Sequence, residues 1–142
     1  MKRNASAVWQ GGPENGKGWV STESGALKEE GYGFSTRFAD GDGTNPEELI
    51  AAAHASCFAM ALSGRLGAAS MTAESIAVKA TVSLDKLEAG WTVTEIHLDV
   101  TAKIPGANAA KFMTAADDAK AGCPISRLLG AAAKITMDAR LA

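Results

Sequence analysis

The feature that most constrains the fold is an apolar segment, Leu49 to Leu62, which is interrupted by only a few polar side chains. Just before it, Asn45 is a favoured N-cap residue, Pro46 suits the first helical position, and Glu48 is placed to close a capping box. The pattern predicts one helix that begins after Asn45 and ends near Leu66. A helix that is apolar on most of its circumference needs cover on most sides.

The apolar segment is shorter than the about 18 residues that a membrane span requires, so we expect no membrane contact. A chain of 142 residues with 46% hydrophobic content can bury one core, which predicts a single domain over residues 1–142. Lys+Arg of 14 against Asp+Glu of 16, without a basic run, argues against nucleic-acid binding. The N-terminus has no apolar region typical of a secretory signal, so we expect a cytoplasmic protein.

The remaining elements are predicted from periodicity and from turn residues. Apolar and polar residues alternate over 76–84, and a turn at 85–90 leads to a second strand, which predicts a long antiparallel hairpin. The fold class is therefore α+β. The other predicted elements are short strands around 8–9, 19–20 and 34–38, a helix over 107–121, a short helix after Cys123, and a final strand over 135–141.

The two cysteines, Cys57 and Cys123, lie far apart in the sequence, so only the fold can make them act together. A zinc site or a CxxC motif needs closely spaced ligands, and we expect no metal. In a reducing cytosol a cysteine pair is more often redox-active than structural. The pattern favours a nucleophilic cysteine with a resolving partner.

Local physics assigns the lower thiol pKa to Cys123, because this residue precedes the short helix and feels the positive end of the helix dipole. Cys57 lies about three turns inside its own apolar helix, where desolvation raises a thiol pKa. A nucleophilic Cys57 therefore needs a cation brought by tertiary structure. The candidates are Arg37, Arg65, His54 and the lysines, and spacing does not choose among them.

Four segments form a recognisable set: Thr36-Arg37-Phe38, Asn45-Pro46-Glu47-Glu48-Leu49, Ala55-Ser56-Cys57-Phe58 and Gly122-Cys123-Pro124-Ile125-Ser126. Together they closely resemble the osmotically inducible protein C (OsmC) and organic hydroperoxide resistance (Ohr) family over essentially the whole chain. Three more segments are similar to the OsmC branch in particular: Val20-Ser21-Thr22-Glu23-Ser24-Gly25, Tyr32-Gly33-Phe34 and Ser83-Leu84-Asp85-Lys86.

The resemblance implies an intertwined homodimer in which antiparallel sheets wrap around long central apolar helices. It also implies a thiol-dependent peroxidase that reduces organic hydroperoxides, and hydrogen peroxide less efficiently, to alcohols in defence against oxidative and osmotic stress. Cys57 would be the peroxidatic cysteine and Cys123 the resolving one, and an external dithiol or lipoylated protein would reduce their disulfide. Arg37 would favour the Cys57 thiolate and Glu47 would orient Arg37. No cofactor is implied.

Helix geometry also distinguishes the two adjacent glutamates. At 3.6 residues per turn, Glu47 lies about 80° around the helix from Cys57, whereas Glu48 points to the opposite side. Glu48 has a structural reading as part of the helix cap. Geometry and resemblance both favour Glu47 as the partner of Arg37.

Three residues near Cys57 are candidates for contact with substrate: His54, Phe58 and Met60. Each residue also has a purely structural interpretation: Phe58 and Met60 could be hydrophobic core residues, and His54 could serve in packing. His54 as a base for Cys57 would instead indicate a cysteine hydrolase. A redox sensor or a protein that binds a small apolar ligand is the remaining alternative.

Overall fold

The computed structural model describes residues 1–142, which form two compact units, Met1–Leu49 and Ile50–Ala142. Helix α2 begins in the first unit and continues into the second. The single domain expected over residues 1–142 stays a prediction.

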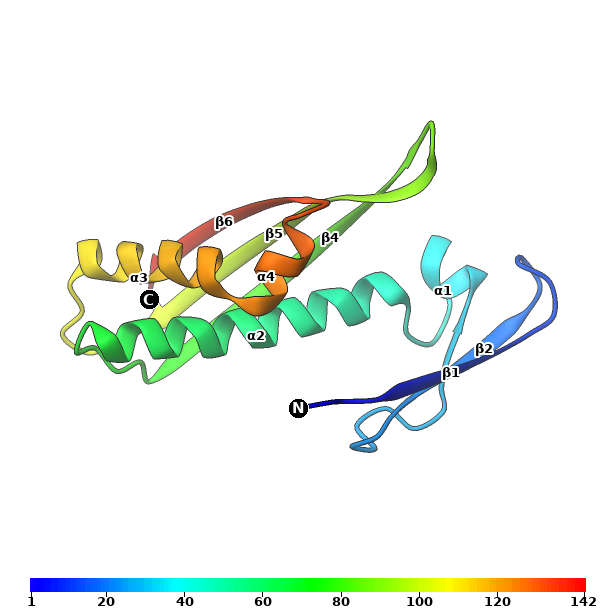
Figure 1. The fold of residues 1–142 in the computed structure, drawn as a ribbon, viewed down its shortest axis with the longest axis horizontal. Helices are drawn as coiled ribbons and strands as arrows, with labels where there is room; N and C mark the ends of the chain where they lie inside the picture. Colours follow the sequence, from blue (N-terminus) through cyan, green and yellow to red (C-terminus); the bar gives the residue numbers. More distant parts are fainter. The chain divides into compact units, whose positions relative to one another are not determined.

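The first unit contains a three-stranded antiparallel sheet of order β1-β2-β3 (Figure 1). Its short strands confirm two of the predicted ones, and Val8 pairs with Trp19 across them. The Trp9 and Tyr32 rings lie 5.5 Å apart between centroids. The elements are β1 Ala5–Gln10, β2 Lys17–Thr22, β3 Glu30–Gly33 and the short helix α1 Phe34–Phe38.

The strand expected over residues 34–38 was wrong, because this segment forms helix α1. The Thr36 hydroxyl accepts from the N–H of Gly33 at 2.9 Å and donates to the Gly33 carbonyl at 3.0 Å. Such side-chain bonds to the local backbone compete with strand pairing and close a helical turn. The preceding strand, β3, ends at Gly33.

Helix α2, Pro46–Ala68, confirms the helix predicted from the apolar segment. The Asn45 side chain accepts from the N–H of Glu48 at 2.8 Å, as an N-cap residue does. The reciprocal half of the predicted capping box was wrong, because the Glu48 carboxylate accepts from the Thr44 hydroxyl at 3.3 Å instead.

Helix α2 is long and apolar enough, by length and composition alone, to cross a membrane. The sequence argument from the length of the segment Leu49 to Leu62 alone was therefore too strict. The core helix of a soluble protein passes the same test, so one such helix is weak evidence. His54, Phe58, Leu62 and Leu66 recur every four residues and are buried, so one face of α2 packs into the second unit.

The second unit contains a sheet of order β4-β5-β6. The long hairpin is confirmed, with strands that extend to Leu87 and from Gly90 and leave a shorter turn than expected. The last strand, β6, pairs in parallel with β5, so the expectation of a wholly antiparallel sheet was wrong. The helices between the two strands provide the crossover that parallel pairing needs. The strands are β4 Ser75–Leu87, β5 Gly90–Lys103 and β6 Lys134–Leu141.

Two helices, α3 Ala109–Gly122 and α4 Pro124–Leu129, connect β5 to β6 and confirm the predicted pair (Figure 1). Asn108 caps α3 by accepting from the N–H of Lys111 at 3.0 Å. The core lies between α2, α3 and one face of the sheet, and Cys123 belongs to it. Its largest members are Phe58, Leu62 and Leu66 of α2, Leu98 and Val100 of β5, and Phe112 of α3.

Candidate active site

The fold brings the two cysteines together across 66 positions of sequence. Cys57 on α2 is half-buried, Cys123 at the N-cap of α4 is buried, and their sulfurs lie 3.1 Å apart as free thiols. A disulfide bond is about 2.05 Å long, so a shift of about 1 Å would join the two sulfurs. The contact is suited to reversible disulfide formation.

The position of Cys123 follows from the chain reversal between α3 and α4. The N–H of Cys123 donates to the Ala119 carbonyl at 2.8 Å and ends α3, and Pro124 then starts α4. The N–H groups of Ile125 and Ser126 at the start of α4 favour the Cys123 thiolate and lower its pKa.

The two thiols have pKa shifts in opposite directions. Burial raises the pKa of Cys57, and its hydrogen bond with Cys123 raises it further, against a smaller opposite effect of the Ile125 N–H. Burial would also raise the pKa of Cys123, but hydrogen bonds from the Ser126 N–H, the Cys57 thiol, the Ser126 hydroxyl and the Ile125 N–H together lower it. Once Cys123 ionises, the Cys57 thiol donates to it. Within this unit the first thiolate therefore forms on Cys123, as local physics predicted from the sequence.

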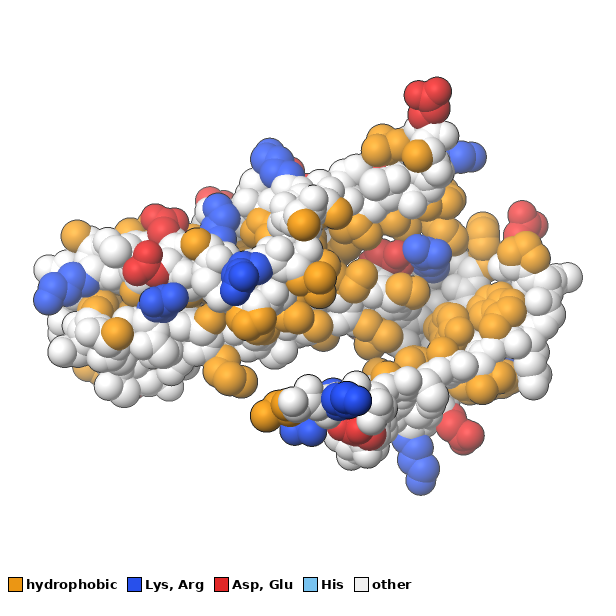
Figure 2. Space-filling view, in the orientation of Figure 1, with side chains coloured by type: hydrophobic (Ala, Val, Ile, Leu, Met, Phe, Trp, Pro, Cys, Tyr) orange, Lys and Arg blue, Asp and Glu red, His pale blue; other side chains and the backbone are white.

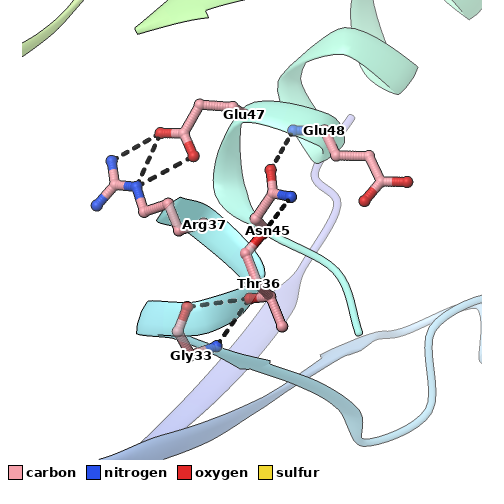
Figure 3. A network of polar contacts seen from close by, with 6 residues as sticks. All are labelled: Gly33, Thr36, Arg37, Asn45, Glu47 and Glu48. Atoms are coloured by element: carbon pink, nitrogen blue, oxygen red, sulfur yellow. Dashed lines mark hydrogen bonds and ion pairs between the residues drawn. The ribbon is translucent and has the colours of Figure 1, made fainter. Parts of the chain in front are cut away.

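Arg37 of α1 and Glu47 of α2 form an ion pair in the first unit (Figure 3). The Arg37 Nε lies 3.1 Å from both carboxylate oxygens of Glu47, and Nη2 lies 2.6 Å from Oε1. Such a forked contact fixes the plane of the guanidinium. Nη1 donates to neither oxygen of Glu47 and remains available as a donor. Glu48 is turned towards Thr44, so the pairing is with Glu47 and not with Glu48.

The loop between α1 and α2 holds this ion pair in place. The N–H of Thr44 donates to the Gly31 carbonyl at 2.9 Å, and the Asn45 amide donates to the Thr36 carbonyl at 3.0 Å (Figure 3). Gly43 has a φ of +126°, and a Cβ there would collide with the Gly31 carbonyl. The glycine therefore permits the close approach that brings Arg37 next to the start of α2.

A small apolar hollow of about 120 Å³ lies beside Arg37 in the first unit. Hydrophobic side chains gather on this part of the surface in Figure 2. Sequence reasoning did not find the hollow, because the spacing of its aromatic residues has no helical or strand period. Besides Arg37, it is lined by Trp9, Pro13, Tyr32, Gly33, Phe34, Phe38 and Pro46.

The three residues predicted to contact substrate differ in exposure. His54 and Phe58 are completely buried, whereas Met60 is 76% exposed. The His54 Nε2 lies 2.8 Å from the Ser126 Oγ and its Nδ1 has no partner, so the structure pairs His54 with Ser126 and not with Cys57. Burial lowers the His54 pKa and keeps the imidazole neutral. Sequence reasoning missed Ser126, although its place three residues after Cys123 was a usable signal.

No group of three or more His, Cys, Asp or Glu side chains is placed to hold a metal ion. The expected lack of a cofactor stays a prediction, as do the roles of the individual residues.

Comparison with known proteins gives relatives of one family. A family model described as OsmC-like protein matches residues 39–138. Peroxiredoxin OsmC of Escherichia coli (strain K12) is 51% identical over 141 residues, which cover 99% of this chain and 97% of that protein. An organic hydroperoxide resistance protein of Xanthomonas axonopodis pv. citri is 29% identical over 89 residues, 62% of this chain and 61% of that protein.

Solved structures share the fold. The OsmC-like protein of Mycoplasma pneumoniae superposes with a TM-score of 0.78 at 16% identity, covering 99% of this chain and 97% of that one. The organic hydroperoxide resistance protein OhrB of Bacillus subtilis gives a TM-score of 0.72 at 22% identity, covering 96% and 98%. At these identities the likeness concerns the fold, and it confirms the predicted α+β class.

Proposed function

The chain belongs to the OsmC family, and on that premise we propose that it is a thiol-dependent peroxidase that reduces organic hydroperoxides to alcohols. The observation that carries the proposal is the contact of 3.1 Å between the sulfurs of Cys57 and Cys123. Two thiols at this distance, one half-buried and one buried, suit a nucleophile and a resolving partner.

In the proposed cycle the Cys57 thiolate attacks one peroxide oxygen, and the O–O bond breaks. The other oxygen leaves with the alkyl group and takes a proton, which gives the alcohol and a Cys57 sulfenic acid. Cys123 then attacks the sulfenic sulfur, so that an S–S bond forms, the S–O bond breaks, and water leaves. An external dithiol returns both cysteines to thiols by thiol–disulfide exchange.

The exposure of the two cysteines supports the proposed division of roles. Cys123 is completely buried, so a peroxide cannot reach it, whereas Cys57 retains exposed surface. The order of pKa values opposes this assignment, because the first thiolate of the isolated pair forms on Cys123. A cation next to Cys57 resolves the conflict, and we assign Arg37, oriented by Glu47, to this task.

We further propose that Arg37 acts on Cys57 of a second copy of the chain in a homodimer. Glu47 and Cys57 lie ten residues apart on helix α2, an axial rise of about 15 Å. An arginine bound to Glu47 therefore serves a thiolate of another chain better. The 76% exposure of Met60 on the same helix is consistent with such an interface.

The finer parts of the assignment are proposals of the same kind. The substrate is an organic hydroperoxide, with hydrogen peroxide the poorer one, and the reductant is a dithiol or a lipoylated protein. We place Met60 against the alkyl group of the substrate, with His54 and Phe58 supporting the wall behind it. The protein acts as one domain in the cytoplasm in defence against oxidative and osmotic stress, without cofactor, metal, nucleic acid or membrane.

Single-turnover reactions of two cysteine variants test the function. Cys123→Ser should consume one equivalent of cumene hydroperoxide and then accumulate sulfenic and sulfinic acid at Cys57, visible by mass spectrometry. Cys57→Ser should consume none, and with excess dithiol only the wild type should turn over rapidly. Equal single-turnover activity in both variants would contradict the roles, and slow consumption by the wild type would favour a redox sensor.

A further inference from the structure

His54 is a buried titratable side chain that the peroxidase cycle leaves unused. It is completely buried on α2, and its Nε2 lies 2.8 Å from the Oγ of Ser126, 72 positions along the chain. Its Nδ1 has no hydrogen-bond partner. A buried imidazole with an unmet nitrogen costs free energy of folding, because the nitrogen has lost water without a replacement.

Ser126 connects this imidazole to the cysteine pair. It is 3% exposed and lies in the first turn of α4, three residues after Cys123. Its hydroxyl and its N–H both favour the Cys123 thiolate. His54, Ser126, Cys123 and Cys57 therefore form one series of polar groups that runs from α2 to α4 and back to α2, and all of them except Cys57 are buried.

The number of hydrogens fixes the direction of hydrogen bonding in this series. A neutral imidazole carries one N–H, and the Ser126 hydroxyl has one hydrogen to donate. If Ser126 donated to Nε2, the Cys123 sulfur would lose that donor and an N–H at Nδ1 would be buried without an acceptor. If Nε2 donates to Ser126, the hydroxyl hydrogen points at Cys123 and the unmet Nδ1 is only a lone pair. Orphaned buried N–H groups are rarer than orphaned acceptors, so the second arrangement is favoured.

We propose that His54 and Ser126 form a relay of hydrogen-bond donors that holds Cys123 as a thiolate for attack on the Cys57 sulfenic acid. This inference rests on the proposed peroxidase function. Cys123 gives up its proton, its sulfur forms the S–S bond, the S–O bond of Cys57 breaks, and the hydroxide that leaves takes a proton to become water. Ser126 donates to the attacking sulfur. His54 is a positioning residue, which acts through Ser126 by directing its hydroxyl hydrogen.

Other charged groups around Cys123 do not replace this relay. The Arg65 guanidinium lies beside Gly122 at the surface, and the charged residues of α3 and α4 are exposed or half-buried. Those of the sheet alternate with its core residues and lie on the opposite face, apart from Asp85 and Lys86, which are exposed near the turn of the hairpin. On the helices they are Lys111, Asp117, Asp118, Lys120 and Arg127, and on the strands Lys79, Asp85, Lys86, Glu95, His97, Asp99, Lys103, Lys134, Asp138 and Arg140.

The test separates the second chemical step from the first. Reduced protein is mixed with one equivalent of cumene hydroperoxide, quenched with acid at intervals, and analysed by intact mass for sulfenic acid and disulfide over a range of pH. Ser126→Ala and His54→Leu should form the disulfide about tenfold more slowly at pH 7. The midpoint of the pH profile should rise by about one unit, since one unit of pKa is tenfold in thiolate.

Variants that keep a donor should retain the rate. Ser126→Thr keeps the hydroxyl, and the amide of His54→Gln places an N–H near the position of Nε2, so both should stay within about threefold of the wild type. Ser56→Ala is the matched control on α2, because its exposed hydroxyl donates only to the Ala53 carbonyl. In a Cys123→Ser background, Ser126→Ala and Ser56→Ala should consume the first equivalent of peroxide at nearly unchanged rates.

The relay is refuted if Ser126→Ala keeps the wild-type midpoint, or if His54→Gln and His54→Leu give the same disulfide rate. Circular dichroism checks that each variant is folded, and Ser126→Ala decides the matter if His54→Leu does not fold. Failure of Cys123→Ser to consume any peroxide would instead refute the proposed function.

Discussion

Removal of the Arg37 guanidinium should suppress the first chemical step by a predictable factor. Burial and the neighbouring Cys123 raise the pKa of Cys57, so its thiolate depends on an external cation. An opposite charge within about 4–6 Å lowers a pKa by about 1–3 units, and below the pKa each unit is tenfold in thiolate. Arg37→Ala should therefore slow peroxide attack at neutral pH by about 10- to 1000-fold.

The size of the effect in related variants follows from the forked contact. Glu47→Gln keeps the guanidinium but weakens the bonds at 2.6 and 3.1 Å, so its rate should fall less than that of Arg37→Ala. Glu48→Gln is the matched control, because Glu48 contacts the Thr44 hydroxyl and not Arg37. Its attack rate should stay near that of the wild type, at a stability cost of about 0.5 kcal/mol for one exposed hydrogen bond.

The assay combines thiolate absorbance with rapid-mixing kinetics in a Cys123→Ser background, so that only Cys57 contributes. The absorbance titration and the pH–rate profile of Arg37→Ala should both move to higher pH by the same amount. If the rate remains low where Cys57 is fully ionised, Arg37 acts on the peroxide as well as on the thiol. The reasoning fails if Arg37→Ala leaves the titration unchanged while Arg65→Ala or His54→Ala shifts it.

Two further outcomes are expected. Burial holds the pKa of His54 below its ordinary 6.5, so the unfolded chain binds the proton more readily than the folded one. The free energy of unfolding should therefore fall as pH drops below 6.5, by up to about 1.4 kcal/mol per pH unit. In urea titrations of reduced protein at several pH values, this fall should be shallower for His54→Gln, and equal falls would contradict a buried neutral imidazole. In a series of alkyl hydroperoxides, kcat/KM should rise about fourfold for each methylene of the substrate that is buried, because each contributes about 0.8 kcal/mol of transfer free energy. A preference for hydrogen peroxide in steady-state kinetics would argue against an apolar site.

Much of the fold could be predicted because its signals are local. The hairpin of β4 and β5 follows from a period of two, and α2 follows from its apolar run and the Asn45 cap. Helix α1 could not be found in this way, because the two bonds between Thr36 and Gly33 outweigh the strand preference of neighbouring aromatic residues. The capping box failed for a similar reason, since the Thr44 hydroxyl offered Glu48 another partner.

The roles of the candidate site residues stay predictions, although two of the expected pairs, Arg37 with Glu47 and Cys57 with Cys123, lie in contact. The pairing of Arg37 with Glu47 agrees with the rotation of each glutamate around α2. The contact between Cys57 and Cys123 depends on how α3 and α4 return to α2, which no spacing in the sequence specifies. The bond between His54 and Ser126 depends on the same return, so His54 was interpreted only from its neighbours on one helix.

The opposite pKa shifts of the two cysteines suit the two halves of the proposed cycle. Two sulfurs 3.1 Å apart cannot both carry a full negative charge at low cost, so the pair holds one charge and titrates as a unit. A guanidinium brought to Cys57 draws that charge to the nucleophile for peroxide attack. Once Cys57 is a sulfenic acid, the repulsion is gone, and the donors around Cys123 stabilise the charge there instead. Burial and the hydrogen bond with Cys123 make Cys57 a poor thiolate in the isolated unit, whereas the Ser126 and Ile125 donors stay in place after Cys57 is oxidised and prepare Cys123 for the second step.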